Sequence, residues 1–296
     1  MGRLTKTMAM IAVLSMTLWA QIPTENLVAF YPLTGNLLDA SGNGHKLDSL
    51  HTSDQRVLPK WVNDRMGTAN RADSFSGGTG GLYAPADSFP QGSSARTISA
   101  WVKLGNLAQP RTIVSWGDKR THRECSFLAL STGGFDYLIF TNGTDSLKYK
   151  TTSLAGIQQW THLAVSLTSA GFATLYWDDS VRTSKQMSSW NTSAGWFGVG
   201  AWFVDQGAPS DPWSGCLDAI SIYKCALTAT EITILANNVT DLLISTHVSV
   251  PNSVQYSAAK NEKSSTLYTV NGRTLKRASI AGLLVGENIK KTLRIQ

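Results

Sequence analysis

Two stretches of sequence decide the fold: LVAFYPLTGNLLDASGNGH at residues 27–45 and GCLDAISIYKCALTATEI at residues 215–232. The first begins as a strand of apolar and aromatic residues and runs into a turn rich in Asp, Asn and Gly. The second is a strand followed by the start of a helix, where Thr228 and Glu231 have the spacing of a capping box. We therefore expect one short helix, over roughly 229–237.

Between these stretches, short runs of β-branched and aromatic residues alternate with turns of Gly, Ser, Asn and Asp. In residues 97–103, Ile98, Ala100 and Val102 share one face of a strand, and more polar residues share the other. So many short strands, without a long helical pattern, predict an all-β fold: a two-sheet antiparallel jelly-roll sandwich with one short C-terminal helix. Further strands are expected at residues 111–116, 126–131, 137–141, 146–150, 161–167, 173–177, 181–185 and 196–201.

The N-terminal pattern predicts a signal peptide over residues 1–20. Arg3 and Lys6 form a basic start, and an apolar run, residues 8–18, follows them. That run is shorter than the ~20 residues that span a bilayer, and no later run is apolar enough to do so. Cleavage is expected between Ala20 and Gln21, which predicts a secreted, extracellular or cell-surface protein.

The remaining chain divides into a main domain at residues 21–240, a linker at 241–265 and a small C-terminal β segment at 266–296. The formal net charge is +6, but the basic residues that produce it lie in the signal peptide and the tail. The main domain is close to neutral by count. Because phosphate backbones need a clustered basic face, we expect no nucleic-acid partner.

The two opening stretches resemble the first and last strands of laminin-G-like (concanavalin A-like lectin–glucanase) jelly rolls, and the resemblance extends over about residues 27–236. It implies sugar binding around a calcium ion, with Asp39 and Asn43 in the first loop and Asp218 in the last strand as ligands. Calcium takes about six to eight oxygen ligands, and Ala219 stands where relatives often carry a second acid. The alternative is that Asp39 and Asn43 only close a turn.

Sugar binding also needs aromatic rings that reach solvent. The chain has ten tryptophans, and those inside strand patterns are expected in the core, where burial is the default. Trp213 matches a packing aromatic of the relatives. We therefore predict a carbohydrate site at Trp202, Trp116 and Trp190, which lie near loops. The tryptophans expected in the core are Trp101, Trp160 and Trp177.

Catalysis is not expected. Glycosidases place two carboxylates about 5–9 Å apart, and in jelly rolls of this kind they are usually glutamates on one strand. Of the five glutamates, only Glu124 is not in the tail, at the helix cap or before the first strand. We therefore expect a non-catalytic carbohydrate-binding module. The alternatives are an adhesive or structural domain that binds protein partners and, third, a glycoside hydrolase of the same fold.

Three cysteines, Cys125, Cys216 and Cys225, are candidates for a disulfide. Cys216 and Cys225 flank one strand. At ~3.3 Å per residue they stand about 30 Å apart, whereas a disulfide needs Cα atoms about 6 Å apart. Cys125 could pair with either, or all three could be free thiols.

The tail has a hairpin pattern around Asn271-Gly272, a glycine-rich stretch and a basic final strand. It resembles the C-terminal sorting segments of secreted Gram-negative bacterial proteins. That resemblance implies contact with the cell surface or the secretion machinery. The alternative is a small β module without a sorting role.

Overall fold

The structure is a computed structural model that describes residues 22–49, 60–78, 80–118, 122–203, 209–238, 280–283 and 290–293. The chain forms two compact units, Met1–Thr246 and His247–Gln296. In the second unit, β16 (Ile280–Leu283) pairs with β17 (Lys290–Leu293) in antiparallel fashion. The predicted signal peptide and the hairpin predicted around residue 271 lie outside the described residues.

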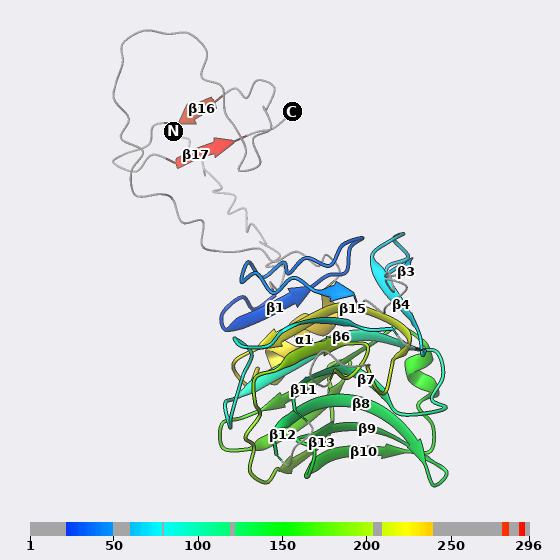
Figure 1. Cartoon of the computed structure of the whole chain (residues 1–296). Helices are drawn as coiled ribbons and strands as arrows, with labels where there is room; N and C mark the ends of the chain where they lie inside the picture. The colour runs from blue at the N-terminus through cyan, green and yellow to red at the C-terminus, as the bar shows by residue number, and fades with distance from the viewer. Residues whose placement is uncertain are drawn as a thin grey trace, which may run out of the picture. The chain divides into compact units, whose positions relative to one another are not determined.

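The first unit is a sandwich of two antiparallel sheets (Figure 1). The eight-stranded sheet has the order β13-β12-β11-β6-β15-β4-β3, and β1 also pairs with β15. Its strands are β1 (Leu27–Tyr31), β3 (Lys60–Val62), β4 (Ala72–Ser76), β6 (Arg96–Leu104), β11 (Thr161–Leu167), β12 (Phe172–Trp177), β13 (Ser180–Gln186) and β15 (Ser214–Tyr223).

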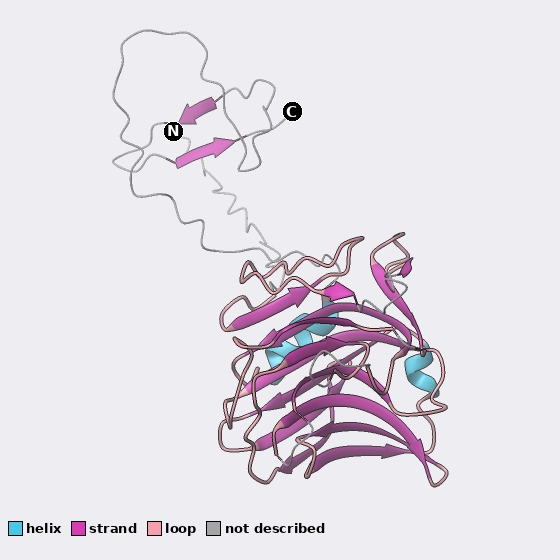
Figure 2. Cartoon of the chain, in the orientation of Figure 1, coloured by secondary structure: helices cyan, strands magenta, loops and turns pink. Residues whose placement is uncertain are grey.

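The seven-stranded sheet has the order β10-β9-β8-β7-β14-β5-β2. Strands dominate this unit, as Figure 2 shows, and the all-β sandwich predicted from the sequence is confirmed. The strands of this sheet are β2 (Asp48–Ser49), β5 (Leu82–Pro85), β7 (Arg111–Gly117), β8 (Glu124–Thr132), β9 (Phe135–Thr141), β10 (Ser146–Thr151) and β14 (Trp196–Val199).

The strands expected between residues 97 and 201 are all present, within a few residues at their ends. In β6, Ile98, Ala100 and Val102 point into the core between the sheets, as the alternation predicted. The strands that the sequence did not predict, β2 to β5, are short. Three of the five residues of β4, ADSFS, are polar, so it lacks a clear alternating signal.

The first and last strands of the sandwich lie side by side: β1 pairs with β15, with Phe30 opposite Ser221. The pairing of β15 with β6 shifts register between Asp218 and Ser221, where Ala219 adopts a φ of 46°. The stretches at residues 27–45 and 215–232 therefore meet in the fold.

The predicted helix is α1 (Ala229–Asn237), and it begins with the expected capping box between Thr228 and Glu231. It packs outside the eight-stranded sheet, where Ile232 and Leu235 are buried in a second apolar cluster with Tyr223. A single turn of 3₁₀ helix, η1 (Ala155–Gln158), precedes β11. None of the helices in the described part of the chain is long and apolar enough to cross a membrane.

Candidate functional site

The first loop, predicted to bind calcium, uses its polar side chains to hold its own backbone. Asp39 Oδ1 accepts from the backbone N–H of Phe30 at 3.0 Å and of Ser41 at 2.9 Å, and Oδ2 accepts from that of His45 at 3.0 Å. The amide nitrogen of Asn43 donates to the carbonyl oxygens of Leu27 and Val28. These contacts tie the loop to β1.

Asp218, the third predicted calcium ligand, is an ion-pair partner. Arg65 Nη1 lies 2.5 Å from Asp218 Oδ2, and the two side chains are 4% and 0% exposed. The same guanidinium donates through Nη2 to the carbonyl of Asn238 at 2.8 Å and lies 5.1 Å from the ring centre of Trp101. A cation already neutralises this carboxylate.

The three residues therefore do not fit a calcium site. The Asp39 carboxylate is committed to backbone N–H groups, Asn43 turns its donor group to the backbone, and a guanidinium covers Asp218. Across the described residues, no group of three or more His, Cys, Asp or Glu side chains is placed to hold a metal ion. The contacts match the turn-closing alternative.

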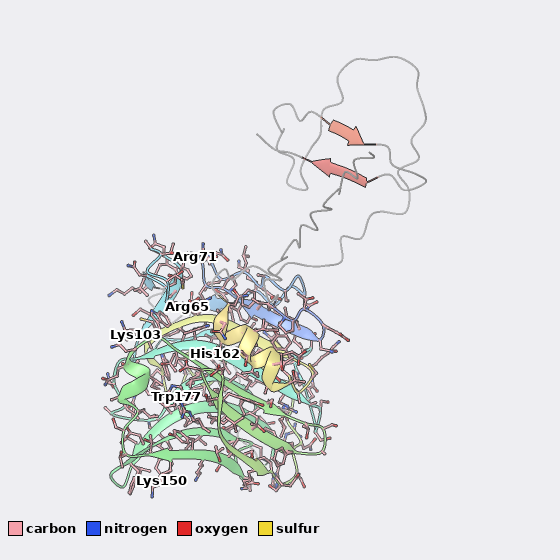
Figure 3. The ribbon with its side chains drawn as sticks, turned by 180° about the vertical axis from the view of Figure 1, so that it is seen from behind. Arg65, Arg71, Lys103, Lys150, His162 and Trp177 are labelled. Carbon is pink, nitrogen blue, oxygen red and sulfur yellow. The ribbon has the colours of Figure 1, made fainter. Side chains whose placement is uncertain are left out.

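The polar cluster around Asp218 extends to His162. His162 Nε2 and Ser99 Oγ are 2.7 Å apart, and the His162 ring lies 5.6 Å from that of Trp101. Burial is the main cause that lowers the pKa of His162 to about 4; a hydrogen bond with the Asp178 backbone opposes it, and the nearby Arg65 charge adds to it. His162 is thus a neutral, structural histidine. Figure 3 shows it on the same side of the sandwich as Arg65.

The three tryptophans predicted to bind sugar are buried, so the expectation that they expose rings is wrong. Trp116 is 0% exposed in the core and donates from Nε1 to the Pro90 carbonyl at 3.0 Å. Trp202 is 3% exposed, and Trp190 is 6% exposed. A sugar ring cannot stack on faces that are covered by protein. Trp101, Trp160 and Trp177, expected in the core, are in fact only partly buried.

Trp202 is buried because its loop folds back onto β7. Gly200 donates to the Ile113 carbonyl at 2.9 Å, and the Trp202 and Ser210 backbones exchange two hydrogen bonds of 2.8 Å. Gly200 has a φ of +68°, and a side chain there would collide with the Phe75 ring. The loop therefore turns tightly at glycine and lays Trp202 against the sandwich. Trp213, expected to pack, is fully buried.

Trp190 differs from the other two because it lines a pocket. Its ring stacks on Phe140 at 4.8 Å, and the buried Arg96 guanidinium lies 5.3 Å from its centre. The pocket has a volume of about 170 Å³, and no charged side chain lines it. The lining residues are Ser93, Leu167, Thr168, Ser169, Ala170, Gly171, Met187, Ser188, Ser189 and Trp190.

The pocket walls are two backbone segments that hydrogen bonds hold at a fixed separation. One is the β11–β12 turn at residues 168–171, and the other leaves β13 at residues 187–190. Met187 N donates to the Gly171 carbonyl at 2.9 Å, and Gln186 Nε2 donates to the Ala170 carbonyl at 2.7 Å. The opening is therefore largely pre-formed.

A buried amide and a carboxylate support the second wall from behind. Asp145 Oδ2 accepts from Ser188 N at 2.7 Å, and Asn142 Nδ2 donates to the Ser189 carbonyl at 2.9 Å. Partial burial raises the pKa of Asp145, but the Lys185 ammonium and the backbone N–H groups outweigh it and lower the pKa to about 2. The carboxylate therefore stays ionised and keeps holding this wall.

Apart from Trp190, the pocket residues were not predicted from the sequence. The available signal was the concentration of small and hydroxyl residues in TSAG at 168–171 and in MSSW at 187–190. Each segment, taken alone, has the composition of an ordinary turn. Only the pairing of β12 with β13 brings the two together.

The cysteines form no disulfide: Cys125, Cys216 and Cys225 all carry free thiols. The disulfide alternatives are therefore not borne out. Cys125 is buried on the inner face of the seven-stranded sheet, and burial raises its pKa to about 12. Cys216 lies in β15 of the other sheet, and Cys225 follows the end of that strand. β15 is extended between them.

Two-sheet jelly rolls occur in lectin domains as well as in other classes of protein. The sequence pattern of the concanavalin A-like lectin/glucanases superfamily matches residues 76–233, more than half of the chain. The chain belongs to this superfamily. A comparison with curated protein sequences finds no match.

Among solved structures, the chain is similar to domain 4 of AbnA, a GH43 extracellular arabinanase from Geobacillus stearothermophilus, in complex with arabinotriose. The TM-score is 0.55 at 24% identity, over 71% of this chain and 98% of that one. It is also similar to the binding domain of Paraclostridial Mosquitocidal Protein 1, with a TM-score of 0.53 at 18% identity over 72% of this chain.

A third similar structure is the binding domain of Botulinum Neurotoxin DC in complex with SialylT, with a TM-score of 0.51 at 13% identity over 72% of this chain. The chain spans about half of each toxin binding domain, 52% in both cases. At these identities the likeness establishes the jelly-roll fold and nothing finer.

Proposed function

We propose that this protein is a secreted, non-catalytic carbohydrate-binding module that takes a polysaccharide or glycoconjugate unit in the Trp190 pocket. The observation that carries the proposal is the lining, which has five serine and threonine hydroxyls beside the largely covered Trp190 ring and no formal charge. Hydroxyl groups both donate and accept hydrogen bonds, which suits the hydroxyls of a neutral sugar.

The size of the pocket restricts its ligand. Ligand pockets commonly enclose about 300–1,000 Å³, and this one encloses about 170 Å³. It suits one sugar unit at a chain end or branch rather than a long run of polymer. The arabinanase domain that shares the fold is described in complex with arabinotriose, so arabino-oligosaccharides are a reasonable first ligand to test.

The pocket offers no support for a hydrolase. Both hydrolytic mechanisms need a pair of carboxyl groups beside the scissile bond, and no acidic side chain lines this pocket. Asp145 lies behind the wall, where it accepts hydrogen bonds from the backbone of Ser188 and Ser146. It is a supporting residue, not an acid that faces a ligand.

The experiment is a glycan array with the purified main domain, run with and without EDTA, followed by calorimetry on the best ligand. Ser169→Trp should abolish binding, because it places a large ring at the exposed rim of the pocket. Ser180→Trp is the matched control, since Ser180 is an exposed serine at the opposite end of the β12–β13 hairpin.

Equal binding by Ser169→Trp and the unmodified protein would remove the pocket from the proposal. A domain that binds no glycan but captures a defined protein ligand would favour the adhesive alternative. Both variants should melt at the temperature of the unmodified protein, because each side chain is exposed and makes no core contact.

We also propose that the two ends of the chain direct the export of the protein. Residues 1–20 would be removed as a signal peptide, and the tail at 266–296 would engage the secretion machinery or the cell surface. The support is the basic and apolar N-terminal pattern and the resemblance of the tail to sorting segments. Mass spectrometry of the exported protein should show a mature N-terminus at Gln21, and deletion of 266–296 should retain the protein inside the cell envelope.

A further inference from the structure

The outer face of the seven-stranded sheet presents a second surface over β8, β9 and β10. The strands pair in register, so that Leu128, Ile139 and Lys148 form one row across them. Leu130, Tyr137 and Lys150 form the next row. The residues between these positions, such as Phe127 and Phe140, point into the core, which places both rows on the outer face.

These rows combine apolar area with positive charge. Leu128, Leu130 and Tyr137 are half-buried, whereas Lys148 and Lys150 are exposed. Both rows lack an acidic side chain, so the two ammonium groups are their only charges. Lys148 and Lys150 lie two residues apart on β10, which separates them by about 7 Å along the strand.

A neighbouring ring orients one of these lysines. Lys150 Nζ lies 3.5 Å from the ring centre of Phe135, diagonally across from it on β9. This cation–π contact holds the ammonium over the sheet face instead of letting it extend freely into solvent. The charge is therefore held over Phe135, two residues from Tyr137 on β9, on the same face of the sheet.

We propose that this face binds an acidic polysaccharide, separately from the neutral pocket. The apolar face of a sugar ring would lie on Tyr137 and the leucines, and the carboxylates of uronate units, or sulfate groups, would meet Lys148 and Lys150. Two lysines are too few for a nucleic-acid backbone, whose binding rests on many phosphate contacts. The surface extends the proposed function to a second class of glycan.

Lysines on an edge strand such as β10 also discourage pairing between copies of a sheet. That role needs charge but no ligand and no aromatic neighbour. The two roles separate experimentally, because only a ligand site makes a polymer's affinity depend on Tyr137 as well as on the lysines.

The test immobilises polygalacturonate, dextran sulfate and neutral dextran and measures binding of the purified main domain at two salt concentrations. Lys148→Gln with Lys150→Gln should weaken binding to the acidic polymers about fivefold, the sum of two exposed charge pairs. The matched control is Lys60→Gln with Lys103→Gln. It removes the same charge from exposed positions on the other sheet, and Figure 3 shows Lys103 well away from Lys150.

Tyr137→Ser should also weaken binding but leave its salt dependence unchanged, because it removes ring contact and no charge. A stronger response to polygalacturonate or to dextran sulfate identifies carboxylate or sulfate as the recognised group. Ser169→Trp should retain binding to the acidic polymers, so failure of the pocket and failure of this face are distinguishable.

Equal losses in the two lysine double variants would overturn the proposal, since net charge alone would then explain the binding. Binding to neutral dextran as strong as to the acidic polymers would also overturn it. So would lysine-dependent binding to a DNA duplex without binding to either acidic polysaccharide. Melting temperatures of all variants identify any loss caused by unfolding.

Discussion

Replacing Arg65 with Met should destabilise the main domain strongly. The substitution leaves the fully buried Asp218 carboxylate without its guanidinium partner at 2.5 Å. It also removes the hydrogen bond from Arg65 to the Asn238 carbonyl. Because a buried carboxylate that loses its cation keeps its desolvation cost, we expect a loss of about 3–5 kcal/mol in the free energy of unfolding.

For a domain of this size, each kcal/mol corresponds to about 2–4 °C in the melting temperature. The expected decrease is therefore about 6–20 °C, measurable by differential scanning calorimetry and, as a free energy, by urea unfolding. Arg71→Met is the matched control. Arg71 forms an ion pair with Asp64 at 3.5 Å, but it is 38% exposed, so its removal should cost less than about 1 kcal/mol.

A double-mutant cycle separates the pair from its surroundings. Asp218→Leu alone should also destabilise the fold, but Arg65→Met combined with Asp218→Leu should recover much of the loss, because two apolar side chains can replace a buried ion pair. If the effects of the single substitutions simply add, or if Arg65→Met costs no more than Arg71→Met, the ion pair is not the stabilising contact that the structure indicates.

Three further predictions concern the first loop, a glycine of β15 and two buried titratable groups. EDTA should leave the melting temperature unchanged, since Asp39 is committed to backbone groups; a decrease that calcium reverses would restore the metal hypothesis. Gly215→Ala should lower the expression of folded protein, because its φ is +127° and a Cβ would collide with the Lys103 carbonyl; soluble yield and circular dichroism would reveal a tolerated side chain. Stability should respond to pH through His162 and Asp73 in opposite directions. Burial lowers the pKa of His162 to about 4, so the unfolded chain binds that proton more readily and this contribution to stability rises with pH from about 4 to 6.5. Burial raises the pKa of Asp73 to about 7, so its contribution falls as pH rises from about 4 to 7. Urea unfolding at pH 4.5 to 6.5 should show stability falling with pH in His162→Gln and rising in Asp73→Asn; the same slope in both variants would refute this assignment.

Local sequence signals predicted most of the fold. The capping box at Thr228 starts the helix where expected, because its hydrogen bonds join residues only three apart. The alternation in residues 97–103 predicts which side chains of β6 face the core, because the strand period is a property of the backbone. The mostly polar β4 was missed, because its strand conformation depends on pairing with β15 and β3.

The candidate site was harder to predict because it depends on contacts between distant residues. Trp116, Trp190 and Trp202 were grouped by their nearness to turns, but exposure depends on what packs over a ring. The chain turns at Gly200 and leaves Trp202 only 3% exposed, and the core encloses Trp116. Of the three, only Trp190 lines a pocket. That pocket forms between two segments, 168–171 and 187–190, which the pairing of β12 with β13 brings together.

By itself, then, the sequence determined the class of fold, the position of the helix, and the scarcity of glutamates for a glycosidase site. These properties follow from local periodicity, capping and composition. The tertiary structure alone decided the role of Asp218. The sequence suggested a calcium ligand, but Arg65, 153 positions away along the chain, lies against its carboxylate. A carboxylate has the same chemistry in either role, and only its partner in space determines which one it performs.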